Sequence, residues 1–75
     1  MKDAIINVFK RVFDSEDINS ETSKQNMDKW DSMNHLRLIV ELEEEFNISF
    51  EPEEIVEMKS IVSIEDIINK KKTNV

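Results

Sequence analysis

"DSMNHLRLIVELEEEFN" (residues 31–47) decides the fold of this 75-residue chain, because its apolar residues recur at α-helical spacing. A helix is predicted from Ser32 to Phe46, with Asp31 or Ser32 as its N-cap. Asn47 follows, and asparagine tolerates the left-handed conformation that often ends a helix. At about 100° per residue, the apolar positions divide into two stripes. The first stripe is expected to face the core and contains Leu38, Ile39, Leu42 and Phe46.

The second stripe of this helix starts one residue after Ser32 and contains Met33, Leu36 and Val40. Its flanks carry charged side chains that favour water, namely Arg37, Glu43 and Glu44. One interpretation places the stripe against another helix or a long loop. The other, which we favour, leaves it as an exposed apolar strip with acidic neighbours, suited to a groove on a partner.

Another helix with a clear apolar face is predicted over residues 2–13. Its apolar residues recur at i, i+1, i+4, i+5, i+8 and i+9 and are Ala4, Ile5, Val8, Phe9, Val12 and Phe13. Residues 14–31 are polar and show no period, which predicts a long first loop. We expect three hydrophobic side chains to pin this loop to the core: Ile18, Met27 and Trp30.

Two further helices are expected toward the C-terminus. Pro52 suits the first position of a brief helix over residues 52–58. The stretch Ser63-Ile64-Glu65-Asp66 approximates a capping box that would open a fourth helix, and Lys70-Lys71-Lys72 would complement the dipole at its end. The sequence therefore predicts an all-α fold. It is a small four-helix bundle of three main helices and one short helix, with a long first loop and no strands.

Size and composition exclude several classes of protein. The chain is long enough for one small domain, residues 1–75, and it contains no cysteine for disulfides or thiolate metal sites. A formal net charge of −7 argues against nucleic acid as a partner and favours proteins with basic patches. The longest apolar run, Leu38-Ile39-Val40, cannot span a membrane, and the N-terminus lacks the apolar stretch of a signal peptide. We expect a monomeric, cytoplasmic protein.

An enzymatic site is not predicted. His35 is the only histidine and follows Ser32 by three residues, but no glycine-built elbow or oxyanion hole accompanies the pair. We therefore expect His35 to be a solvent-facing helix residue. A calcium loop beginning at Asp14 would need glycine at Asn19 and glutamate at Gln25, so no metal site is expected.

The sequence resembles the acyl carrier proteins over about residues 2–69. The resemblance rests on Asp31-Ser32-Met33, Leu36, residues 38–46, Ile48 and Ser63-Ile64-Glu65-Asp66-Ile67-Ile68. In that family the serine of an Asp-Ser-Leu or Asp-Ser-Met triplet receives 4′-phosphopantetheine from coenzyme A. The resemblance implies attachment at Ser32, with Asp31 as its motif neighbour. A phosphodiester there would lie at a helix N-terminus, where free N–H groups favour an anion.

The resemblance also implies partners. These are a phosphopantetheinyl transferase and an acyl or aminoacyl ligase, acyltransferase or synthase whose basic patches meet acids of the main helix. The implied docking surface comprises Met33, Leu36, Arg37, Val40, Glu43 and Glu44. Fatty acyl, aminoacyl, hydroxyacyl and polyketide cargoes all remain open, and cargo in this family can lie between the helices. The alternative function is an unmodified, acidic helical module for protein–protein interaction.

The sequence departs from the family pattern at positions where glycine is frequent. Lys29-Trp30 precedes the Asp-Ser pair, Asn47 follows the Glu-Phe end of the main helix, and the chain has no glycine at all. The Gly-Gly-Asp-Ser signature of many peptidyl carrier domains is also missing, which argues against that subtype. These departures favour a specialised, free-standing carrier over the housekeeping protein of fatty-acid synthesis.

Overall fold

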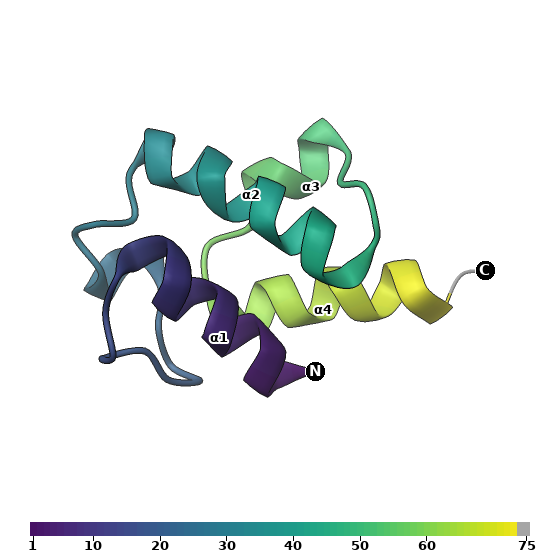
Figure 1. Cartoon of the computed structure of the whole chain (residues 1–75). Helices are drawn as coiled ribbons and strands as arrows, with labels where there is room; N and C mark the ends of the chain where they lie inside the picture. The colour runs from purple at the N-terminus through teal and green to yellow at the C-terminus, as the bar shows by residue number, and fades with distance from the viewer. Residues whose placement is uncertain (74–75) are drawn as a thin grey trace.

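The computed structural model describes residues 1–73, and over this range it contains four α-helices and one short 3-10 helix (Figure 1). They are α1 (Lys2–Phe13), η1 (Lys24–Asn26), α2 (Ser32–Phe46), α3 (Pro52–Glu57) and α4 (Ile61–Thr73). The first loop joins α1 to α2, and its backbone pairs with the start of α4 through a single β-bridge between Ser23 and Ser60. The all-α prediction, with three main helices, a short one and a long first loop, is confirmed.

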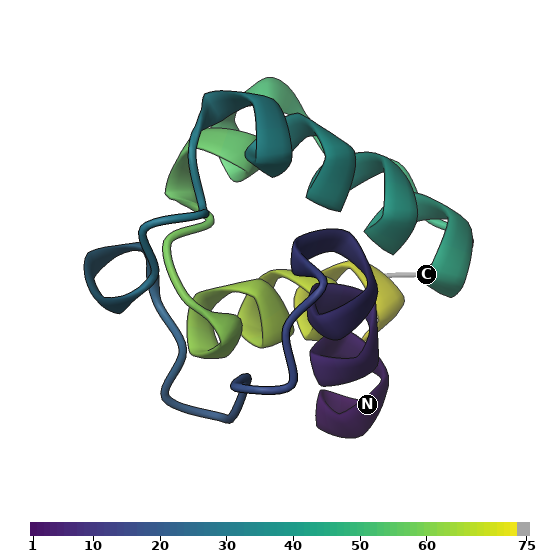
Figure 2. The same ribbon diagram turned by 60° about the vertical axis from the view of Figure 1, so that its left-hand side comes forward.

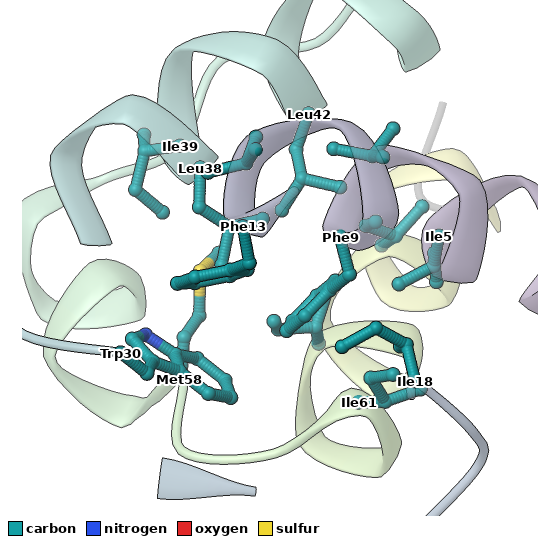
Figure 3. Packing of buried hydrophobic residues seen from close by; sticks show 14 of the residues in the cluster. Ile5, Phe9, Phe13, Ile18, Trp30, Leu38, Ile39, Leu42, Met58 and Ile61 are labelled. Carbon is teal, nitrogen blue, oxygen red and sulfur yellow. The ribbon is translucent and has the colours of Figure 1, made fainter. Parts of the chain in front are cut away.

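The hydrophobic core lies where α1 meets α2 and α4 (Figures 1 and 2). Ile5, Val8 and Phe9 of α1 are completely buried, and so are Ile61, Ile64 and Ile68 of α4. The loop contributes Ile18 and Trp30, both buried (Figure 3). Met27 is partly buried and packs against the same cluster. The predicted anchoring of the loop is therefore confirmed.

Helices α1 and α2 each end at a residue in the left-handed conformation. Asp14 ends α1 at φ 50°, and Asn47 ends α2 at φ 55°. The N–H group of Asn47 donates to the carbonyl of Glu43, which satisfies one of the free carbonyls at the helix end. The predicted end of α2 is thus confirmed, and asparagine takes the place of the glycine that is frequent there.

The predicted start of α4 was wrong by three residues. The helix begins at Ile61, and Ser60 and Ser63 cap each other: the N–H of Ser63 donates to Oγ of Ser60, and the N–H of Ser60 donates to Oγ of Ser63, both at 3.1 Å. This is the reciprocal arrangement of a capping box, placed three residues earlier than expected. The short helix ends one residue earlier than predicted, so that Met58, completely buried, follows α3.

The first stripe of α2 mostly faces the core, as predicted. Leu38 and Leu42 are completely buried and Ile39 is 5% exposed. Phe46 differs, because it is only partly buried and its ring lies 6.0 Å from the ammonium of Lys72. Phe46 therefore packs against the core as expected but lies at its edge, so the stripe reaches solvent at its C-terminal end.

Candidate functional site

Ser32 is the first residue of α2 and its side chain is exposed. The N-cap is Asp31, whose Oδ1 accepts a hydrogen bond from the N–H of Asn34 at 2.9 Å. Of the two candidates for this cap, the structure therefore selects Asp31. Because Asp31 supplies the cap, the exposed side chain of Ser32 is not needed for capping and is accessible to another molecule.

The segment that leads into Ser32 is tied to the first turns of α2. The side-chain amide of Asn34 donates to the carbonyl of Lys29 at 2.8 Å. The indole N–H of Trp30 donates to Nδ1 of His35, also at 2.8 Å. The serine is consequently held from both sides, by the helix that follows it and by the anchored loop that precedes it.

His35 is buried, with 7% of its surface exposed, so the expected solvent-facing position was wrong. Its second ring nitrogen, Nε2, lies 2.9 Å from the carbonyl oxygen of Ile55 in α3. Burial lowers the pKa of His35 below its ordinary value of 6.5; the contact with the carbonyl raises it, and the positive charge of Lys24 lowers it. Both ring nitrogens are engaged away from Ser32, so His35 does not form a nucleophile–base pair with that serine.

A sequence signal for the burial of His35 was present. His35 precedes Leu38 by three residues, Ile39 by four and Leu42 by seven, which continues the buried stripe of α2 by one turn. Its hydrogen-bond partner Trp30 lies in the loop, where no period marks orientation. The pairing of the two residues therefore had no comparable signal.

The second stripe of α2 is exposed. The exposed fractions of Met33, Leu36 and Val40 are 74%, 62% and 54%, so the interpretation that placed the stripe against another helix or the loop was wrong. Leu36 and its neighbours form an apolar strip that starts beside Ser32. We call these three residues the α2 strip.

The charged flanks of the α2 strip are not all alike. Arg37 and Glu44 are exposed, and Arg37 makes a long hydrogen bond of 3.4 Å to Asn34. Glu43 is half-buried, and its carboxylate accepts from the N–H of Phe50 at 2.9 Å. The expectation that Glu43 simply faces water was therefore wrong, because its side chain fixes the turn after α2.

The residues around Ser32 fit a phosphate ester. The first turn of α2 carries no acidic residue, and the N–H groups at its start favour an anion. Within residues 1–73, no three histidine, cysteine, aspartate or glutamate side chains gather in a way that could hold a metal ion. The same range contains no helix with the length and apolar character needed to cross a bilayer.

Comparisons with known proteins agree with this geometry. The family model described as "phosphopantetheine attachment site" matches residues 3–68. Among solved structures, the chain is similar to the holo acyl carrier protein from Geobacter metallireducens, with 36% sequence identity and a TM-score of 0.85. That match covers 96% of this chain and 85% of the other. A search of curated proteins finds no significant match.

The chain belongs to the phosphopantetheine-attachment family and, within it, to the acyl carrier proteins. It functions as a carrier with covalently attached 4′-phosphopantetheine, and this role implies interaction with partner enzymes. The bound group supplies a thiol on a flexible arm, which holds the cargo as a thioester. Carrier domains of this kind are generally not enzymes themselves.

Proposed function

We propose that Ser32 is the residue that carries 4′-phosphopantetheine. The observation that supports this most directly is the exposed serine of an Asp-Ser-Met triplet at the start of α2, with the cap supplied by Asp31. Esterification of a capping serine would disturb the helix end, whereas esterification of Ser32 leaves the cap intact.

The contribution of the protein to this site is to present and stabilise the ester. The Ser32 oxygen forms the phosphodiester, and the N–H groups and dipole at the start of α2 stabilise its negative charge. Because the side chain is exposed, the arm extends into solvent and toward partner enzymes. The chain itself acts without a catalytic site of its own.

Intact-mass measurement tests the attachment. Incubation of the protein with coenzyme A, magnesium and a broad-specificity phosphopantetheinyl transferase is expected to add one phosphopantetheine group. Ser32→Ala should abolish the addition, and Ser49→Ala, a control at another exposed serine, should not. Addition that persists in Ser32→Ala would place the site elsewhere. A wild-type protein that gains no mass would favour the unmodified interaction module instead.

The α2 strip and its charged neighbours are the proposed docking surface for the transferase and for the loading enzyme, an acyl or aminoacyl ligase, acyltransferase or synthase. Exposed apolar area beside the attachment serine supports this role, since apolar contacts supply most of the affinity of such surfaces. Arg37, Glu43 and Glu44 border the strip, and the carboxylates suit basic residues of the partner. We infer that these encounters occur in the cytoplasm and that the carrier is monomeric.

A further inference from the structure

A single hydrogen bond joins the only tryptophan of the chain to its only histidine, on either side of Ser32. Trp30 lies two residues before the serine, in the first loop, and His35 lies three residues after it, in α2. Because His35 also contacts the carbonyl of Ile55, the imidazole connects the loop, α2 and α3. Neither residue belongs to the attachment motif or to the α2 strip.

We propose that His35 is a positioning residue for the modification of Ser32, and that it acts by holding Trp30 and thereby the segment leading into the serine. The proposal rests on Ser32 as the attachment residue.

The partners of the imidazole determine its protonation state. An indole N–H can only donate, so Nδ1 of His35 must be the acceptor and carries no hydrogen. A carbonyl oxygen can only accept, so Nε2 must carry the hydrogen and donate to Ile55. Of the three forms of histidine, only the neutral ring with its hydrogen on Nε2 satisfies both contacts.

Trp30 is well placed to transmit this restraint to Ser32. Trp30 is 5% exposed, and its ring packs edge-on against Phe9 with centroids 5.1 Å apart (Figure 3). The same ring stacks on His35 at 5.9 Å. Only Asp31 separates Trp30 from the serine. A loosened Trp30 would free the backbone immediately before Ser32, and small displacements of a reacting atom cost large factors in rate.

Protonation of His35 would break the restraint. A hydrogen on Nδ1 would face the indole N–H across a distance of 2.8 Å, which sets two donors against each other. Exposed charged residues on the surrounding elements are Asp28 and Lys29 of the first loop and Glu53 and Glu57 of α3. Three further charged groups are Lys24 in η1, Asp31 at the start of α2 and Glu54 in α3. Lys24 opposes protonation. The other two are engaged elsewhere, since Asp31 caps α2 and Glu54 pairs with Lys71 at 2.8 Å.

The sign of the pH effect follows from the lowered pKa of His35. The folded protein binds the proton less readily than the unfolded chain, whose histidine titrates near 6.5. The neutral bridge is therefore intact above that pH. Its contribution to stability is lost as the pH falls from there through the lower pKa of the folded state.

Three variants separate the two halves of the bridge. His35→Asn keeps an acceptor oxygen near the position of Nδ1 but cannot titrate, and His35→Gln keeps a donor within reach of the Ile55 carbonyl. Trp30→Phe keeps aromatic packing against Phe9 and removes the indole N–H. Circular dichroism and urea unfolding establish that each variant is folded at the assay temperature.

The rate of modification is measured with coenzyme A, magnesium and the transferase. At about pH 8, where histidine is neutral, His35→Asn should stay within about twofold of wild type in kcat/KM for the carrier. His35→Gln and Trp30→Phe should fall about fivefold, which corresponds to a hydrogen bond of about 1 kcal/mol. The KM for coenzyme A should not change, because that substrate binds the transferase. Folded variants that all stay within about twofold of wild type would overturn the proposal.

The pH dependence of the modification rate distinguishes a positioning role of His35 from a purely structural one. The ratio of wild-type rate to His35→Asn rate, taken from about pH 8 to about pH 5, cancels the pH dependence of the transferase. This ratio should fall in step with the titration of the single His35 Cε1–H resonance, and the Trp30 indole N–H resonance should shift with it. A constant ratio across that titration would contradict the proposal.

The two proposals fail in different ways. A wild-type protein that gains no phosphopantetheine refutes the assignment of Ser32 and the positioning role together. A wild-type protein that is modified, with unchanged rates in folded Trp30→Phe and His35→Gln, refutes only the positioning role.

Discussion

Asp31 and Ser32 divide two tasks at the start of α2. Asp31 satisfies the helix end through its bond to Asn34, and Ser32 presents an exposed hydroxyl. If the modified serine were also the N-cap, attachment of phosphopantetheine would change the stability of the helix. Here the two tasks belong to neighbouring side chains, so a modification of Ser32 would leave the capping of α2 unchanged.

This division predicts opposite outcomes for two adjacent substitutions. Asp31→Ala should lower the free energy of unfolding by about 1 kcal/mol, because it removes the cap. Ser32→Ala should leave it nearly unchanged, since alanine suits a helical position. Urea denaturation of both variants measures the difference, with Asp31→Asn as the control that keeps an acceptor oxygen. A larger loss in Ser32→Ala than in Asp31→Ala would contradict the assignment of the cap.

At the residue scale, features set by neighbours in the sequence could be predicted, whereas contacts between residues far apart in the sequence could not. The position of Ser32 follows from the Asp-Ser-Met triplet and the period of the helix after it, which involve neighbours in the sequence. The environment of His35 depends on Trp30 in the loop and on the carbonyl of Ile55, twenty residues away. Periodicity contains no information on such contacts, although the spacing of His35 from Leu38 and Leu42 indicates its burial.

At the scale of elements, α2 uses two faces for two purposes. Leu38 and Leu42 are buried against the core, whereas the α2 strip is open to solvent. The bounds of α1 and α2 were predictable because each combines a strong apolar period with polar residues at its ends. The start of α4 was not, because Ser60, Ser63 and Asp66 offer capping residues at the same three-residue spacing. Burial of Ile61 selects the earlier pair.

The exposed face of α2 predicts that Val40→Asp impairs loading without unfolding the domain. The substitution places a charge within the proposed apolar contact, so the loss should be the same at low and moderate salt. Val62→Asp is a matched control, because Val62 is 55% exposed on α4 and Val40 is 54% exposed on α2. The transferase reaction followed by intact mass, with circular dichroism alongside, measures the effect. Equal rates in the two variants would remove the α2 strip from the docking surface.

The acidic flank of the same helix predicts a salt-dependent effect. Glu44→Lys should slow loading most at low salt, because exposed charges mainly steer encounter and are screened over about 10 Å at 0.1 M. Asp66→Lys changes the net charge equally at an exposed site on α4. Rates of modification across a salt series compare the two. Glu43 is unsuited to this test because its carboxylate holds the turn at Phe50.

At the scale of the whole molecule, the charge of −7 acts against folding. Seventeen acidic residues face ten basic ones, so repulsion exceeds attraction in the compact state. Raising sodium chloride from low concentration to about 0.1 M should therefore increase the melting temperature, and magnesium should act similarly. Thermal unfolding followed by circular dichroism provides the measurement. A melting temperature that stays flat or falls would show that ion pairs such as Glu54 with Lys71 dominate instead.

The arrangement of the helices is a property of the whole molecule that periodicity alone does not specify. The period of α1 identifies its apolar face, but not that this face meets both α2 and α4 (Figure 2). The sequence pattern predicted the helix order and the long first loop, but not how the helices pack together. Phe46 shows the limit of the pattern, since it shares the stripe of Leu42 and nevertheless lies at the edge of the core.

The burial of Trp30 gives this carrier an intrinsic optical probe. As the only indole in the chain, it is the sole source of tryptophan fluorescence, and it lies two residues from Ser32, the proposed attachment site. Its emission wavelength reports whether the core around it is dry, and its intensity responds to the charge on the stacked imidazole. Unfolding, protonation and events at the neighbouring serine can thus be followed by light, without a label on the protein or its cargo.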